Sequence, residues 1–183
     1  MLLILPRTKA DLHSASAMER INELEAIVKR SLTAFTEHVD RTHWYGKERE
    51  MVSYYAFGFL VKECRAGSAL FDPAQIAIES RVPQIEGPKR KKQVCKDVCI
   101  WSEPGQNCWD ADHKSTVAPM LIMEWKYNTS KIFAYDQDWL EQYSFAREDF
   151  IGLCVSLDLR KDRIRLNTAV VRNGISTTDW LRP

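Results

Sequence analysis

Apolar residues recur at helical spacing in the first quarter of the chain. The recurring positions, three and four residues apart, are Ile21, Leu24, Ile27, Val28, Leu32 and Phe35. They form one apolar face of a helix predicted over residues 16–38, and Ser16 followed by Glu19 has the spacing of a capping box at its start. A second helix is predicted over residues 47–64. Nearly every position from Met51 to Val61 is apolar or aromatic, which is typical of a buried helix.

Further along the chain the pattern becomes that of strands, first as alternation of Ile76 and Ile78 with Ala77 and Glu79, then as apolar or β-prone runs. Strands are predicted over residues 76–80, 94–101, 119–127, 150–159 and 164–171, with a helix over 136–148, a loop over 104–118 and a turn over 160–162. The order helix, helix, three strands, helix, two strands predicts an α/β fold with a central mixed sheet flanked by helices. We expect a helical extension over 1–46 and one α/β domain over 47–183.

The composition is that of an ordinary globular chain, with 45% hydrophobic and 28% charged residues. The net charge of +1 excludes a generally basic protein but allows nucleic-acid contact through a local patch. The longest apolar run, from Tyr54 to Val61, is far shorter than the roughly 20 residues of a membrane span. Met1 to Leu5 is too short for a signal-peptide core of about 7–15 residues. We therefore expect a soluble cytoplasmic protein with no membrane partner.

The chain has five cysteines, an odd number that does not suggest a secreted disulfide framework. Cys95, Cys99, Cys108 and His113 invite a zinc interpretation. If 94–101 is a strand, however, Cys95 and Cys99 lie about 13 Å apart, too far for one tetrahedral zinc ion with Zn–S bonds of about 2.3 Å. Free thiols are the favoured interpretation.

Charged side chains at two predicted strands carry the candidate chemistry. Asp97 lies in the strand over 94–101, and Glu124 and Lys126 lie near the end of the strand over 119–127. Because strand side chains alternate, Glu124 and Lys126 point to one side and Trp125 to the other. If the two strands are neighbours, Asp97 comes beside Glu124, and two carboxylates suit Mg²⁺ or Mn²⁺. The alternative is a surface salt bridge between Lys126 and either acid.

This ordered set resembles the PD-(D/E)XK nuclease superfamily, whose members have a restriction-endonuclease-like fold. The resemblance covers roughly residues 47–172. Asp97 matches the first motif, with Lys96 in place of its loosely kept proline, and Glu124 and Lys126 match the second. The resemblance implies Mg²⁺- or Mn²⁺-dependent hydrolysis of phosphodiester bonds. The alternative is a domain that kept the nuclease fold, lost turnover and acts as a nucleic-acid-binding or protein-interaction module.

The superfamily often places a further acid on its first helix, and here Glu48 and Glu50 are the candidates. They are two residues apart, or about 200° around a helix, so only one can face the site. Glu50 is slightly favoured. The backbone carbonyl of Trp125, beside Glu124 in the strand, is expected to be a further metal ligand. Oligomeric state is left open, with a homodimer as one option.

A basic run precedes the Asp97 strand, and residues 81–100 hold six Lys or Arg against two Asp or Glu. The candidate nucleic-acid contacts are Lys89, Arg90, Lys91, Lys92 and Lys96. Such a patch attracts a phosphate backbone, with DNA the favoured partner. The alternatives are a solvated loop and a targeting signal. A second basic group is either a further phosphate contact or a polar hairpin turn, with the turn slightly favoured; it comprises Arg160, Lys161, Arg163 and Arg165.

Overall fold

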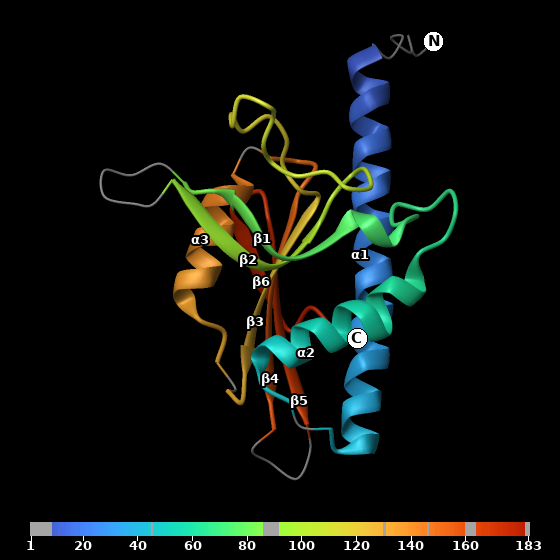
Figure 1. Cartoon of the computed structure of the whole chain (residues 1–183), viewed down its shortest axis with the longest axis vertical. Helices are drawn as coiled ribbons and strands as arrows, with labels where there is room; N and C mark the ends of the chain where they lie inside the picture. The colour runs from blue at the N-terminus through green and yellow to red at the C-terminus, as the bar shows by residue number, and fades with distance from the viewer. Residues whose placement is uncertain are drawn as a thin grey trace, which may run out of the picture.

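The computed structural model is a mixed α/β fold in which helices cover both faces of one sheet (Figure 1). The structure describes residues 9–44, 46–85, 92–129, 131–145, 147–159 and 164–181, with side chains from residue 17 onward. The three α-helices are α1 (Lys9–Thr42), α2 (Glu48–Tyr55) and α3 (Ala134–Ser144). The six strands are β1 (Ile76–Pro83), β2 (Gln93–Ile100), β3 (Leu121–Tyr127), β4 (Ile151–Asp158), β5 (Arg165–Arg172) and β6 (Ile175–Thr178).

The strands lie in the sheet in their chain order, β1 to β6. All neighbouring strands are antiparallel except β3 and β4, which are parallel and joined by the crossover through α3. The predicted mixed sheet is confirmed, and so is the antiparallel pairing of the strands that carry Asp97 and Glu124. The short strand β6 was not predicted. It adds an edge strand beyond the five that the sequence indicated.

Each face of the sheet has its own apolar core. On one face, α1 and α2 pack together, and the rings of Phe35 and Tyr55 lie 5.7 and 5.1 Å from that of Trp125 on β3. The other face is covered by α3 (Figure 1), whose Trp139 and Leu140 belong to the second core. The predicted boundary between the helical extension and the α/β domain, after residue 46, lies just beyond the end of α1. The helix α1 nevertheless packs in the same apolar core as the sheet.

Two helices begin or end away from their predicted limits. The first helix already runs from Lys9, so Ser16 lies inside α1 and the capping-box prediction is wrong. No glycine or proline between Lys9 and Ser16 interrupts helical backbone there. The helix predicted to reach residue 148 ends at Ser144, because the backbone of Phe145 is extended, with ψ of 126°.

The helix predicted over residues 47–64 has the expected extent but three kinds of turn. The α-helical part ends at Tyr55 and continues as a π-helical turn over Ala56–Leu60 and a 3₁₀ turn over Val61–Glu63. A π turn shifts the faces of a helix relative to the preceding turns. Tyr55 is fully buried, whereas Phe57 is 66% exposed, so the expectation of burial on all sides is wrong at Phe57.

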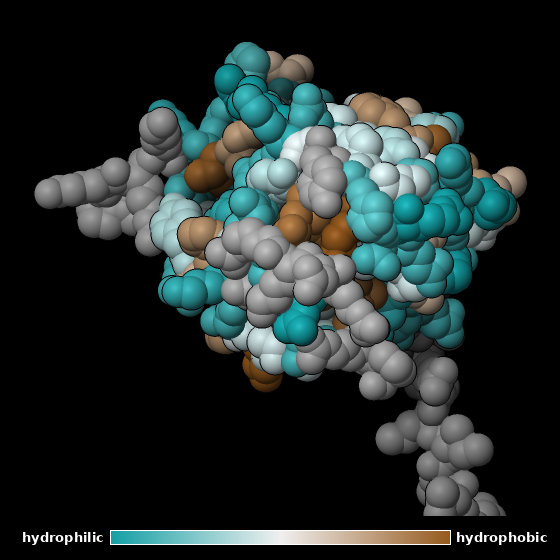
Figure 2. Space-filling model, turned by 90° about the horizontal axis from the view of Figure 1, so that it is seen from below, coloured by the Kyte–Doolittle hydropathy of each residue, from teal (hydrophilic) through white to brown (hydrophobic). Residues whose placement is uncertain are grey.

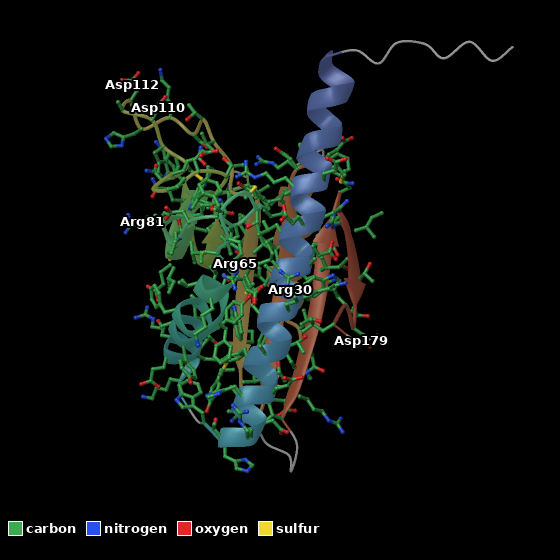
Figure 3. The ribbon with its side chains drawn as sticks, turned by 90° about the vertical axis from the view of Figure 1, so that its right-hand side faces the viewer. Arg30, Arg65, Arg81, Asp110, Asp112 and Asp179 are labelled. Atoms are coloured by element: carbon green, nitrogen blue, oxygen red, sulfur yellow. The ribbon has the colours of Figure 1, made fainter. Side chains whose placement is uncertain are left out.

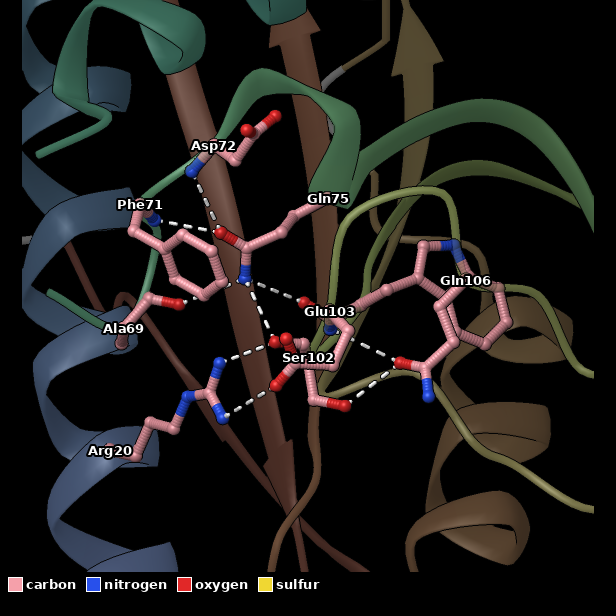
Figure 4. A network of polar contacts seen from close by, with 9 residues as sticks. Arg20, Ala69, Phe71, Asp72, Gln75, Ser102, Glu103 and Gln106 are labelled. Atoms are coloured by element: carbon pink, nitrogen blue, oxygen red, sulfur yellow. Dashed lines mark hydrogen bonds and ion pairs between the residues drawn. The ribbon is translucent and has the colours of Figure 1, made fainter. Parts of the chain in front are cut away.

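A buried carboxamide, that of Gln75, fixes the start of β1 (Figure 4). Its Oε1 accepts from the N–H of Phe71 at 2.7 Å, and its Nε2 donates to the carbonyl of Trp101 at 2.9 Å. Nearby, Arg20 of α1 donates to the carbonyl of Ser102. Because buried amides are costly unless hydrogen-bonded, this network holds the β1–β2 pair and α1 in one arrangement.

The face of the molecule seen from below is mainly polar. Hydrophilic residues dominate this view, and apolar residues form only small patches in it (Figure 2). Within the described ranges, no helix has the length and apolar character needed to cross a membrane.

Candidate nuclease site at the β2–β3 fork

The candidate site lies where β2 and β3 separate. Their antiparallel pairing runs from Ile100 opposite Leu121 to Val98 opposite Met123. The next residue of β2, Asp97, reaches across with its side chain, and its Oδ2 accepts from the N–H of Trp125 at 2.7 Å. The carboxylate thus takes the place of a main-chain acceptor. We call this place the β2–β3 fork.

The β1–β2 pairing is also interrupted at this level. Residues on both sides of Asp97 pair with β1, but Asp97 and the facing Glu79 do not, and Glu79 has a left-handed φ of 50°. Regular alternation would put Lys96 and Val98 on one face of the sheet. Instead Val98 lies in the core under α1 and α2, while Lys96 lies over the ring of Trp139 on α3. The interruption is what turns Lys96 toward the α3 face.

Glu124 is buried on that same face, in an ion pair with Lys96. The Lys96 ammonium donates to Oε1 of Glu124 and lies 3.5 Å from the ring centroid of Trp139. Only 4% and 8% of the Lys96 and Glu124 side chains are exposed. Burial raises the pKa of Glu124 to about 7, Lys96 opposes that rise, and the negative charges of Asp97 and Asp136 add to it. The prediction that Lys96 contacts nucleic acid is wrong for this structure, because its ammonium is buried against Glu124.

Lys126 is held between α3 and its own strand. Its Nζ lies 3.0 Å from Oδ2 of Asp136 and donates to the carbonyl of Trp125 at 3.0 Å. Burial works to lower the pKa of Lys126, but the hydrogen bond and charge of Asp136 outweigh it and raise the pKa above its ordinary value. Lys126 and Glu124 lie on one face of β3, as predicted, and α3 covers that face. Sequence reasoning missed Asp136, whose only signal was an acid in the first turn of the helix after the Glu-X-Lys strand.

The acids of α2 are separated as the helical geometry requires. Glu48 and Asp97 line one cleft, of about 480 Å³, between α2 and the β1–β2 strands. Glu50 instead accepts from the N–H of Lys47 at 2.7 Å and caps the start of the helix. Of the two α2 acids, the structure therefore favours Glu48, in contrast to the slight preference for Glu50, and Glu79 of β1 lines the same cleft.

The donors at the fork have the chemistry of a hard-cation site, since Asp97, Glu124 and the carbonyl of Trp125 supply oxygen. Each already has an internal partner: the Trp125 N–H, the Lys96 ammonium and the Lys126 ammonium, respectively. In the part of the chain that the structure describes, no three His, Cys, Asp or Glu side chains form a metal cluster. Mg²⁺ commonly takes one or two protein carboxylates together with substrate phosphate oxygens. Asp97 lines the cleft beside α2 and Glu124 the hollow beside α3, so an ion shared by both carboxylates requires Lys96 to move away from Glu124 and the two side chains to turn toward each other.

The remaining predicted nucleic-acid contacts divide into two groups. Lys92 is exposed at the start of β2, and Arg165 is exposed on β5. Lying outside the described residues are Lys89, Arg90, Lys91, Arg160, Lys161 and Arg163. Of the basic run before the Asp97 strand, Lys92 is therefore the residue that the structure describes as exposed.

No protein-family model, curated protein or solved structure matches this chain. Function must therefore be argued from the fold and from the chemistry of the β2–β3 fork.

Proposed function

We propose that this chain is a metal-dependent nuclease with a restriction-endonuclease-like fold, related to the PD-(D/E)XK superfamily. The element order supports it: an acidic helix α2, the meander β1–β2–β3, and the crossover α3 leading to β4, parallel to β3. One observation carries the proposal. The Asp97 carboxylate meets the Glu124-X-Lys126 strand at the fork, where it bonds to the residue between them.

Asp97 and Glu124 would hold the ion, with the carbonyl of Trp125 as a further oxygen. A bound Mg²⁺ or Mn²⁺ supplies Lewis-acid stabilisation of the scissile phosphate and lowers the pKa of an attacking water. With its pKa near 7, Glu124 is partly protonated around neutral pH. Metal binding therefore requires Glu124 to lose its proton and its hydrogen bond from Lys96.

Lys126 serves as a cation in this proposal. Asp136 raises the pKa of Lys126, so its side chain stays an ammonium at neutral pH. An ammonium has no lone pair with which to accept a proton. Lys126 therefore offsets the charge that develops on the phosphate and orients the attacking water by donating hydrogen bonds, while Asp136 positions its head group.

The proposed partner is nucleic acid, with DNA favoured. The proposed location of the protein is the cytoplasm. Lys92 brings positive charge to the start of β2, on the strand that carries Asp97. The five cysteines are free thiols, as is usual in a reducing compartment. A homodimer stays an open option, since cutting both strands of a duplex often requires two sites.

The test is a cleavage assay with Mg²⁺ or Mn²⁺ on single-stranded, double-stranded and branched DNA and RNA. Asp97→Asn is the informative variant, because the amide oxygen can still accept from the N–H of Trp125 while the negative charge is lost. We expect Asp97→Asn and Glu124→Gln to lose cleavage and stay folded. Asp112→Asn is the matched control, since Asp112 lies on an exposed loop at the upper end of the molecule, away from the fork (Figure 3). Cleavage that persists in Asp97→Asn would show that the active centre is not at the β2–β3 fork.

A second candidate is a nuclease-fold module without turnover, which binds nucleic acid or protein. The buried pair between Lys96 and Glu124 favours it, because the ammonium already neutralises the carboxylate that a metal would need. Calorimetric titration with Mn²⁺ separates the two candidates. Binding that Glu124→Gln abolishes supports the nuclease, and no binding together with no cleavage supports the module.

A further inference from the structure

Two exposed aromatic rings lie beside the β2–β3 fork. In the described part of the chain, five large apolar side chains are exposed: Phe57, Phe133, Tyr135, Phe145 and Ile175. Tyr135, in the first turn of α3, is 65% exposed and lines a hollow of about 300 Å³ together with Lys96 and Glu124. Phe133, the residue before α3, is 47% exposed, and the Nζ of Lys126 lies 5.7 Å from its ring centroid. Both rings thus adjoin residues of the proposed active site.

Two exposed cations lie near these rings. Lys92 is exposed at the start of β2, and alternation along the strand puts it on the same side as Val94, which packs in the α3-side core. Lys131, two residues before Phe133, is exposed as well. Arg81 is also exposed, but it pairs with Cys95, which lines the cleft beside α2, so it lies on the opposite face of the sheet. The surface on the α3 side therefore combines the two rings with Lys92 and Lys131.

Exposed rings interleaved with cations suit a nucleic acid whose bases are unpaired. Base faces are buried in the stack of a duplex, whereas an unpaired strand can place them on aromatic side chains while basic residues follow the phosphates. A surface that binds only a duplex backbone needs cations and gains nothing from exposed rings. Here the rings adjoin Glu124 and Lys126, and Lys92 and Lys131 are the exposed cations on the same side of the sheet.

We propose that this surface binds single-stranded nucleic acid, with bases stacked on Phe133 and Tyr135 and phosphates beside Lys92 and Lys131. The inference that this strand is the substrate rests on the proposed nuclease function. The binding itself does not, because no step of it needs the metal or the reaction. The nuclease would then act on single strands, or on the unpaired portions of branched molecules.

The experiment measures binding without cleavage. Fluorescence anisotropy in EDTA compares a short labelled single strand with the same strand annealed to its complement. We expect the full-length protein to bind the single strand at least about tenfold more tightly. Phe133→Ala and Tyr135→Ala are each expected to weaken single-strand binding by about tenfold, the loss typical of one base–aromatic stack. The thermal unfolding of each variant confirms that it is folded.

Two control variants separate stacking from general damage to α3. Tyr135→Phe keeps the ring and is expected to bind like the wild type. Phe145→Ala removes a ring that is 73% exposed at the far end of α3, about 15 Å along the helix, and is also expected to bind like the wild type. Lys92→Ala is expected to weaken binding and to reduce its dependence on salt concentration.

Equal affinity for the single strand and the duplex would overturn the inference. So would single-strand binding that Phe133→Ala and Tyr135→Ala leave unchanged, or an absence of binding to either probe. These outcomes are independent of the nuclease proposal. A protein that binds single strands through the rings but cleaves nothing would contradict only the proposed function, and one that cleaves duplex without single-strand preference would contradict only this inference.

Discussion

Two glutamates, Glu25 and Glu124, each lie beside a lysine or arginine, yet the fold shifts their pKa values in opposite directions. Glu25 of α1 accepts from the indole N–H of Trp180 at 2.5 Å, is hydrogen-bonded to Arg172, and lies 3.5 Å from the ammonium of Lys29. Burial works to raise the pKa of Glu25, but these three partners outweigh it and lower the pKa below its ordinary value of 4.5. At Glu124, burial prevails over Lys96 and the pKa rises to about 7.

The difference follows from exposure and from the neighbouring charges. The Glu25 side chain is 21% exposed and that of Glu124 is 8% exposed. The carboxylate charge of Glu25 is favoured by every partner named above, whereas Glu124 also has Asp97 and Asp136 nearby. A fully satisfied ion pair joins parts of a fold, and a carboxyl group with a raised pKa near other charges is typical of a functional site. Glu25 therefore joins α1 to the C-terminal segment, and Glu124 belongs to the proposed active centre.

Exchanging each glutamate for glutamine tests this contrast with the largest expected effect. We expect Glu124→Gln to lower metal-dependent cleavage by about 10³-fold or more, because a metal ligand supplies several kcal/mol of transition-state stabilisation. Glu25→Gln is expected to retain cleavage near the wild-type rate. Single-turnover rates on one labelled oligonucleotide provide the measurement. Equal losses of cleavage in the two variants would contradict a specific role for the Glu124 carboxylate in the reaction.

Removing the cation from each pair gives a smaller effect, on stability. Lys96→Met leaves Glu124 buried without its counter-ion, and we expect the free energy of unfolding to fall by about 3 kcal/mol in EDTA. If Glu124 is a metal ligand, Mg²⁺ should restore part of that loss, since a ligand that binds only the folded state stabilises it. Urea unfolding with and without Mg²⁺ measures both effects. A variant that Mg²⁺ does not stabilise would favour the module without turnover.

Arg172→Met is the corresponding change at Glu25, and it should cost less. The Arg172 side chain is 27% exposed, and Glu25 keeps its contacts with Trp180 and Lys29. We expect the free energy of unfolding to fall by about 1–2 kcal/mol, as for a hydrogen bond to a charged group. Mg²⁺ should not change this value in Arg172→Met relative to the wild type. Rescue of both variants by Mg²⁺ would remove the distinction between the two pairs.

The pH dependence of stability should have opposite signs at the two sites. A lowered pKa means that Glu25 stabilises the fold above pH 4.5 and that this contribution is lost as the pH falls through the folded-state value. A raised pKa means that folded Glu124 keeps its proton between pH 4.5 and about 7, so stability falls as the pH rises through that range. In EDTA, Glu25→Gln should flatten the acid limb of the stability profile. Glu124→Gln should instead flatten the decline toward neutral pH.

The order of elements and the pairing of the two key strands could be predicted from the sequence. Short apolar runs bounded by turn residues mark β2 and β3. The alternation of strand side chains places Glu124 and Lys126 on one face. Glu48 and Glu50 also behave as the helical repeat requires, although only the structure distinguishes the cap from the cleft.

The position of Lys96 could not be predicted from the sequence. Alternation assumes an uninterrupted ladder, and the left-handed backbone at Glu79 together with the unpaired Asp97 breaks it. Lys96, which the sequence placed in a basic patch, is therefore the ion-pair partner of the buried Glu124 carboxylate. The roles of Asp136 and Phe133 depend on how the loop before α3 returns to β3, which no local pattern encodes.

The most direct measurement is the anomalous diffraction of crystals soaked in Mn²⁺. We expect a peak between the carboxylates of Asp97 and Glu124, with the ammonium of Lys96 displaced from Glu124. No peak at saturating Mn²⁺, with Lys96 still bonded to Glu124, would contradict the metal-dependent nuclease.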